Sequence, residues 1–149
     1  MPGGTVAVAS DHAGFDLKEI LKRDLQAAGH DALDLGTNSP QSVDYPDFGH
    51  ALAEAVAAGK ASRGVLVCGT GIGISIAANR NPKIRAALVH DVTSARLSRA
   101  HNDANVVAFG QRLIGAETAR EALKVFLSTG FEGGRHAGRV AKLSKGCTP

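Results

Sequence analysis

The sequence has few aromatic residues, few cysteines and no long apolar run. It contains no Trp and one Tyr among 149 residues, so surfaces on which nucleic-acid bases could stack are scarce. The two cysteines, Cys68 and Cys147, do not resemble a disulfide framework, which indicates a reducing, cytoplasmic setting. The longest uncharged run, residues 64–79, is too short and too rich in glycine to span a membrane. We therefore expect no membrane segment and, from the N-terminal residues, no signal peptide.

The charged residues are spread along the chain without a run of one sign. The formal net charge is +3 and the pI is near 9.1, which favours a small anionic ligand such as a phosphorylated metabolite over a nucleic-acid backbone. The six histidines lack metal-ligand spacing, so we expect no metal site. A length of 149 residues fits one domain, residues 1–149, with a helical tail from about residue 130.

Short apolar runs alternate with segments of helical periodicity along the whole chain. Strands are predicted at 5–9, 31–35, 64–67, 84–89 and 105–109, and helices at 15–28, 48–58, 74–79, 93–100 and 116–127, with one more in the tail. This alternation is typical of right-handed βαβ units, so the fold class is α/β with a mainly parallel sheet covered on both faces. Ligands of such sheets bind beyond the carboxyl ends of the strands.

One stretch, residues 63–80, combines a buried strand, a glycine turn and the start of a helix. Cys68 ends the strand and Gly69–Gly73 form the turn. Such a turn directs several backbone N–H groups and a helix dipole at one point, where they bind an anion and stabilise a thiolate. The stretch matches neither the P-loop nor the dinucleotide-binding pattern. Glycine turns are also common without function, and a cysteine at a strand end is often a small buried hydrophobe.

Polar residues follow four of the predicted strands. Because the carboxyl ends of parallel strands share one edge of a sheet, we expect these residues to converge. They are Asp11–His12, Cys68–Thr70, His90–Asp91 and Gly110–Arg112. Asp11 is equally compatible with capping the first helix, and Asp91 is more typical of a helix cap than of a ligand.

Four further residues are candidates on chemical grounds. Tyr45, the only tyrosine, either lines a pocket or anchors its loop. His101 is able to transfer protons near neutral pH, although a lone loop histidine is more often solvated. Arg135 and Arg139 are four residues apart and share a helix face, where they either clamp a phosphate or form a solvated basic tail.

Five segments occur in an order that is far more specific than the glycine turn alone. They are 10–18 (SDHAGFDLK), 44–46 (DYP), 68–79 (CGTGIGISIAAN), 101–105 (HNDAN) and 132–136 (EGGRH). Together they resemble the type B ribose-5-phosphate isomerases and the related galactose-6-phosphate isomerase subunits. The resemblance covers essentially the whole chain.

This resemblance implies a Rossmann-like three-layer αβα sandwich with a five-stranded parallel sheet. It implies a cofactor-independent isomerase that interconverts an aldose phosphate and its ketose phosphate, and a homodimer or dimer of dimers whose active sites are shared between subunits. Ribose 5-phosphate is the substrate that the resemblance favours. The same chemistry on a tetrose or hexose phosphate is one alternative, and a non-catalytic phosphate-sensing module is another. The sequence leaves open the physiological substrate, dimer or tetramer, the pathway and the role of Cys147.

The resemblance also implies a role for each matching residue. Cys68 corresponds to the base that moves a proton between adjacent sugar carbons, and members without this cysteine use a glutamate where this chain has Ile74. The N–H groups of the turn correspond to a cradle for the enediolate oxygen, assisted by Thr70, and His101 corresponds to the residue that opens the furanose ring. The implied substrate-binding residues are Asp11 and Asn102 for sugar hydroxyls, His12, Arg112, Arg135 and Arg139 for phosphate, and Gly69, Gly71, Ile72 and Gly73 in the turn. Arg112 and the segment around His101 are expected to reach the neighbouring subunit's pocket.

Overall fold

A computed structural model describes residues 4–145, and in it five strands form one parallel sheet. The strand order is β2-β1-β3-β5-β4, and every pair in it is parallel. The strands are β1 (Thr5–Ser10), β2 (Asp31–Asp34), β3 (Arg63–Cys68), β4 (Ala86–Leu88) and β5 (Val106–Gly110). The order changes direction at β1 and β3, which places the expected ligand site beyond the carboxyl ends of these two strands.

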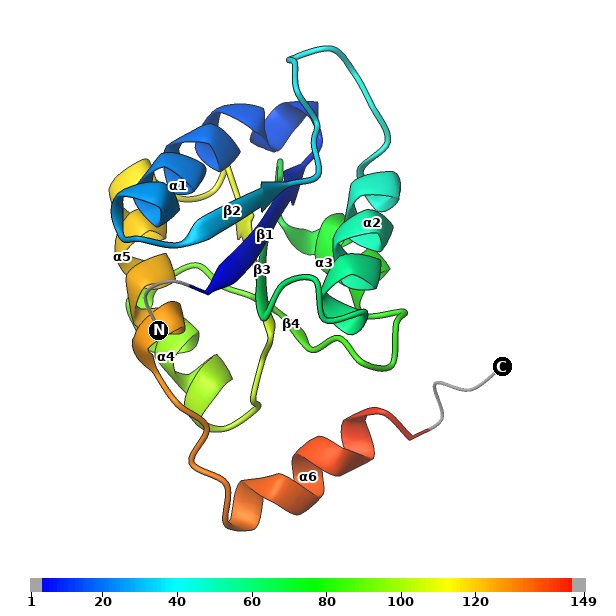
Figure 1. The fold of residues 1–149 in the computed structure, drawn as a ribbon, viewed down its shortest axis with the longest axis vertical. Coiled ribbons are helices and arrows are strands. Elements are labelled where there is room, and N and C mark those ends of the chain that lie inside the picture. Colours follow the sequence, from blue (N-terminus) through cyan, green and yellow to red (C-terminus); the bar gives the residue numbers. More distant parts are fainter. Residues whose placement is uncertain (1–3, 146–149) are drawn as a thin grey trace.

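Helices cover both faces of the sheet, as Figure 1 shows. Helices α2 and α3 lie on one side, and α1, α4 and α5 lie on the other. The helices are α1 (Phe15–Ala27), α2 (Tyr45–Ala57), α3 (Ile72–Ala78), α4 (Val92–Ala100), α5 (Ala116–Ser128) and α6 (Arg135–Leu143), with a short 3-10 turn at His12–Gly14. The predicted five-stranded parallel sheet in a three-layer αβα sandwich is confirmed.

Alternation along the central strands divides the core into two clusters. Val65 and Val67 pack with the residues of α1, α4 and α5, whereas Leu66 and Cys68 pack with those of α2 and α3. All four side chains are buried. The strand period therefore decides which layer the Cys68 sulfur faces, namely the layer that contains the start of α3.

Several elements differ from the predicted boundaries by one to three residues, and two of these differences have a clear physical reason. Helix α2 begins at Tyr45 rather than at residue 48, because Pro46 fits the first helical turn, where its missing N–H needs no partner. Strand β4 is shorter than predicted because it is an edge strand, and the Ile84 N–H bonds to the Asn81 carbonyl instead of joining the sheet. Ile84 is apolar because it packs in the core next to α2 and α3, which its sequence pattern did not distinguish from strand pairing.

Helix α6 lies outside the three layers. In Figure 1 it runs below the amino-terminal ends of the strands, and it is joined to α5 by a loop. Most of its residues are exposed, and His136 is its one buried residue. Cys147 lies beyond the described residues. Across residues 4–145, no helix combines the length and the apolar character that crossing a bilayer requires.

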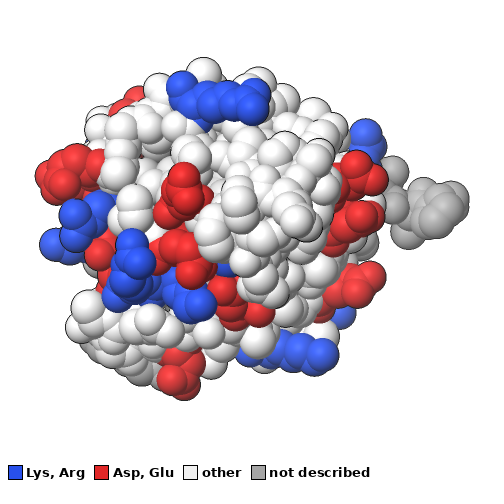
Figure 2. All heavy atoms as spheres, turned by 90° about the horizontal axis from the view of Figure 1, so that it is seen from above, with Lys and Arg blue, Asp and Glu red and all other residues white. Residues whose placement is uncertain are grey.

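Figure 2 views the molecule from above and shows how its charges are distributed on that face. Lysine and arginine side chains alternate with acidic ones, and a broad uncharged area lies among them. This face therefore has no extended basic field of the kind that binds a polyanion.

Candidate functional site

The glycine turn holds the sulfur of Cys68 close to backbone donors. The side chain is 5% exposed, and the Gly71 N–H donates to its Sγ at 3.1 Å. The Thr70 Oγ1 accepts from the Ile72 N–H at 3.2 Å. The next N–H groups of α3 have no acceptor within the helix because they belong to its first turn. The turn thus combines a thiol, a hydroxyl and main-chain donors within a few residues.

Glycine is required at Gly71, and Gly73 is closely covered by a neighbouring side chain. Gly71 has φ 78°, and a Cβ there would lie 2.9 Å from the backbone of Phe109. A Cβ on Gly73 would lie 2.4 Å from the ring of Tyr45. The turn is therefore enclosed by β5 on one side and by the start of α2 on the other.

Three of the four predicted strand ends converge here, as expected. The Asp11 N–H donates to the Val67 carbonyl at 3.3 Å, and the Gln111 N–H donates to the Cys68 carbonyl at 2.9 Å. The Arg112 N–H donates to the Gly69 carbonyl at 3.0 Å, and the Arg112 side chain lies along Gly69. Arg112 thus lies beside the turn of its own chain, and its reach toward a neighbouring subunit stays a prediction.

The residues after β1 have structural tasks as well as available polar atoms. Asp11 caps the 3-10 turn, because its Oδ1 accepts from the Gly14 N–H at 3.1 Å. The His12 Nδ1 accepts from the Val43 N–H at 3.1 Å, which ties the loop before α2 to this edge. With Nδ1 as the acceptor, the proton of neutral His12 resides on Nε2, where it is available to an anion.

Tyr45 and Asp91 each have a structural role that the contacts define. The Tyr45 ring covers Gly73 and remains 41% exposed, so it both anchors the start of α2 and contributes to the surface beside the turn. The Asp91 Oδ1 accepts from the Ser94 N–H at 2.6 Å and caps α4, and this hydrogen bond lowers the pKa of Asp91. Asp91 is therefore a helix cap, as its sequence context favoured.

His101 lies at the opposite edge of the sheet from Cys68. It follows the last residue of α4, and Asn105, four residues later, accepts from the Gly64 N–H at the start of β3. Six residues of β3 separate the two edges by roughly 17 Å. One chain therefore does not bring the predicted ring-opening histidine to the predicted base.

His101 has neighbours of its own at this second edge. Its ring stacks on that of His136, with centroids 4.5 Å apart, and its Nε2 lies 4.0 Å from the Glu132 Oε1. Burial lowers the pKa of His136, and the positive charges of His101 and Arg135 lower it further. The sequence spacing gave no sign of this cluster, because His101 and His136 are far apart in the chain.

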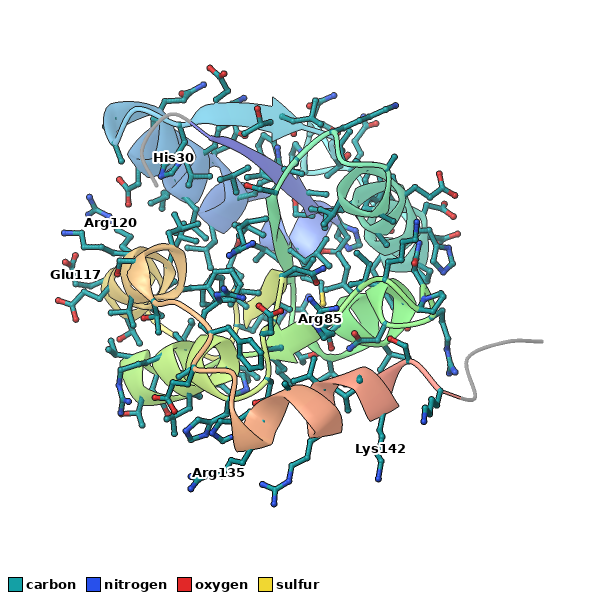
Figure 3. All side chains as sticks on the ribbon, turned by 60° about the horizontal axis from the view of Figure 1, so that its bottom comes forward. His30, Arg85, Glu117, Arg120, Arg135 and Lys142 are labelled. Atoms are coloured by element: carbon teal, nitrogen blue, oxygen red, sulfur yellow. The ribbon has the colours of Figure 1, made fainter. Side chains whose placement is uncertain are left out.

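The tail residues also lie at this second edge. Arg135 and Arg139 are exposed, and Figure 3 shows the Arg135 side chain pointing away from the body of the molecule. Asn102 lines a hollow of about 390 Å³ between the segment before β4 and the end of α6. A larger hollow, of about 570 Å³, lies between α1 and α5 and contains none of the predicted site residues. The predicted site is thus divided into two groups.

The family described as Ribose/Galactose Isomerase matches residues 6–143. The chain belongs to this family. It is 45% identical over 139 residues to ribose-5-phosphate isomerase B of Escherichia coli, covering 93% of each chain. It is 41% identical over 140 residues to D-erythrulose-4-phosphate isomerase of Pectobacterium atrosepticum, covering 93% of this chain and 92% of that one. Ribose-5-phosphate isomerase B of Clostridium thermocellum superposes with a TM-score of 0.94 at 47% identity, with 95% of each chain covered.

Membership of the ribose/galactose isomerase family makes this chain a sugar phosphate isomerase. The buried position of Ile74 is informative in that context. Its side chain is 0% exposed and belongs to the same apolar core cluster as Leu52 and Cys68. No ionisable group occupies this position, and Cys68 is the ionisable side chain that the turn itself supplies.

Sequence reasoning missed a buried ionic network that supports the site. The Lys18 side chain is 0% exposed, and its Nζ contacts both carboxylate oxygens of Asp34 at 2.9 Å. Asp34 also accepts from the Gly36 N–H and from Lys22. Burial alone would raise the pKa of Asp34, but these hydrogen bonds outweigh it and the pKa lies below its usual value. The network fixes the exit of β2 beside the Ser10 backbone, which bonds to Gly36 and Thr37.

Proposed function

We propose that this isomerase interconverts ribose 5-phosphate and ribulose 5-phosphate through an enediolate, without a cofactor. The observation that carries the proposal is the placement of the Cys68 sulfur against the N–H groups of the glycine turn. A base and a set of oxyanion donors must lie within one sugar unit of each other for this reaction, and the turn supplies both.

The reaction balances with these groups alone. The Cys68 thiolate removes the proton from C2 of the open-chain aldose, and the C–H electron pair forms the C1–C2 double bond. The negative charge moves to the carbonyl oxygen, where N–H groups of the turn and Thr70 stabilise it. The thiol then returns the proton to C1, while the C2 hydroxyl gives its proton to the oxygen on C1.

The separation of the two groups implies that the complete site needs two subunits. Cys68, His12 and Arg112 lie at one edge of the sheet, and His101 lies with the tail arginines at the other. In a symmetric dimer, the first edge of each subunit faces the second edge of its partner. Each active site then receives the base from one chain and the ring-opening histidine and Arg139 from the other.

A second substrate class has an observation in its favour. The relative from Pectobacterium atrosepticum, similar over nearly the whole chain, is named for a tetrose phosphate. The two candidates share the proton transfer and differ in the length of sugar that the loop before α2 and the partner subunit enclose. Aldose and ketose phosphates with four, five and six carbons, assayed side by side, distinguish them by kcat/KM.

Replacement of Cys68 tests the chemistry. Cys68→Ala should retain the fold and sugar-phosphate binding and lose isomerisation by about 10²–10⁴-fold, the usual contribution of a general base. Iodoacetate should inactivate the native enzyme, and substrate should protect it. An aldose–ketose rate in Cys68→Ala equal to that of the native chain would refute the proposed base.

Subunit mixing tests the shared site. Cys68→Ala and His101→Asn dimers should each be inactive alone, and exchange of their subunits should restore activity. At equal mixing, half of the dimers are mixed and one of their two sites is intact, so about a quarter of native activity should return. If each site were built within one chain, both sites of a mixed dimer would be defective and no activity would return.

A further inference from the structure

His101, Glu132 and His136 form a cluster that the proposed isomerisation does not account for. Their ligand atoms all lie within 4.8 Å of one another. The Glu132 Oε1 is 3.6 Å from the His136 Nε2 and 4.0 Å from the His101 Nε2. The three side chains come from the end of α4, the loop after α5 and the first turn of α6, so the fold itself assembles them.

One member of the cluster has an unsatisfied polar atom. The His136 side chain is 9% exposed, and its Nε2 is buried without a hydrogen-bond partner among the described residues. A buried nitrogen without a partner costs free energy, and its occurrence in a native fold requires an explanation. This nitrogen points toward Glu132, where a ligand shared with the other two side chains would satisfy it.

We propose that His101, Glu132 and His136 bind a divalent transition-metal ion, with Zn²⁺ the best match. Two imidazoles and one carboxylate with an open fourth position are a donor set typical of zinc. Ligand atoms about 2.0–2.1 Å from a tetrahedral zinc lie about 3.3 Å apart, so the cluster must contract slightly. Glu132 and His101 are 60% and 39% exposed, and both are free to move; His101 turns out of its stack on His136 to direct its nitrogen at the ion.

The surrounding charges define what kind of metal site this is. Arg135 and Arg139 lie close enough to act on His136, and they oppose a dication, whereas Glu132 favours it. Affinity therefore depends on the two imidazole bonds, which suit zinc but not Mg²⁺ or Ca²⁺. A site with three protein ligands and two arginine side chains nearby is expected to bind the metal ion reversibly.

Occupation of this site has a consequence that rests on the proposed function. His101 supplies one of the three bonds, so the ion occupies the nitrogen that ring opening uses. Zinc should then slow turnover of the cyclic sugar phosphate, and a chelator should restore it. This regulation concerns the same residue as the reaction, so binding must be measured separately from activity.

Direct metal binding to the full-length chain tests the proposal without reference to catalysis. Zn²⁺ is titrated against a chromophoric chelator, and Co²⁺ is added separately to record its visible spectrum. Glu132→Gln and His136→Asn should each weaken Zn²⁺ binding by at least about 10–100-fold, since loss of even an outer-shell partner costs that much. Glu117→Gln on α5 and His50→Asn on α2 are exposed matched controls that should bind as the native chain does.

The Co²⁺ absorption spectrum and the Zn²⁺ affinities of the variants show whether the metal binds to this cluster. Tetrahedral Co²⁺ absorption with nitrogen and oxygen ligands, lost in Glu132→Gln, supports the site. A sulfur-to-cobalt charge-transfer band would place the metal on a cysteine and overturn the proposal, as would unchanged affinity in both variants. Glu132 is exposed, so its variant keeps the test valid even if His136→Asn folds poorly. Metal binding without slower turnover would leave the site intact and contradict the role of His101 instead.

Discussion

The two edges of the sheet are built in opposite ways. At the carboxyl edge, the glycine turn is enclosed so tightly that added Cβ atoms on Gly71 and Gly73 would overlap neighbouring atoms. At the amino edge, the tail arginines are exposed, and α6 packs so loosely that it buries one residue. The turn at the first edge is assembled within one chain, and the second edge presents exposed arginine side chains to the outside.

This difference indicates how the work of the enzyme is divided. Proton transfer needs atoms held in a fixed geometry, which a packed turn provides. In the proposed reaction, the tail arginines that bind phosphate and the histidine that opens the ring are exposed or partly exposed side chains. Substitutions in the glycine turn should therefore affect the chemical step, and those of the tail arginines should affect binding.

The largest effect is expected from a methyl group in the turn. Gly71→Ala places a Cβ 2.9 Å from the Phe109 backbone at a positive φ, so the turn must move and its donors lose their alignment. We expect kcat to fall by about 10²–10³-fold, as for loss of an oxyanion donor. Gly115→Ala is the matched control, because its Cβ would contact nothing within 4 Å. Native kinetics in a folded Gly71→Ala chain would show that the turn does not constrain the chemistry.

A smaller effect, on stability, is expected from the ionic network behind the first edge. Asp34→Asn leaves the buried Lys18 with Glu19 as its remaining acidic contact. The cost should be about 3 kcal/mol of unfolding free energy, toward the low end for breaking a buried pair. Denaturant titration at neutral pH measures it, with Asp47→Asn on the exposed start of α2 as the control.

The pH dependence of that cost follows from the lowered pKa of Asp34. A carboxyl whose folded pKa lies below its ordinary value of 3.8 contributes stability in full above that value. The contribution is lost as the pH falls through the lower, folded pKa. The difference between the native chain and Asp34→Asn should therefore be constant above about pH 5 and shrink in more acidic solution. A difference that stays constant into strong acid would show that the carboxylate charge is not what stabilises Lys18.

The smallest effect is expected at the second edge. Arg139→Ala removes charge-assisted hydrogen bonds to phosphate worth about 1.5–3 kcal/mol, which raises KM by about 10–100-fold while kcat changes little. Lys142→Ala, one turn further along α6 and pointing outward in Figure 3, is the control. A fall in kcat at constant KM would place Arg139 with the chemistry and erase the distinction between the two edges.

Local pattern was enough to predict most of the fold. Alternating apolar strands and periodic helices defined the αβα layers, and the edge rule for parallel sheets brought Asp11, Cys68 and Arg112 together. The rest depended on tertiary contacts. The sequence around Pro46 is typical of a loop, whereas in the structure Pro46 lies in the first turn of α2. The bonds from Lys18 to Asp34 join residues whose spacing in the sequence predicts no contact. The separation of His101 from Cys68 follows from the direction of α4, which motif matching does not consider.

The hydrogen bond from the Gly71 N–H to the Cys68 sulfur has one more consequence. A thiolate is a strong acceptor and a thiol is a weak one. In the proposed reaction, this hydrogen bond weakens when the sulfur takes the substrate's proton, at the step in which negative charge appears on the sugar oxygen. In that reaction the same amide serves the base before the proton transfer and the enediolate oxygen after it, so one main-chain dipole stabilises the negative charge on both sides of the transfer.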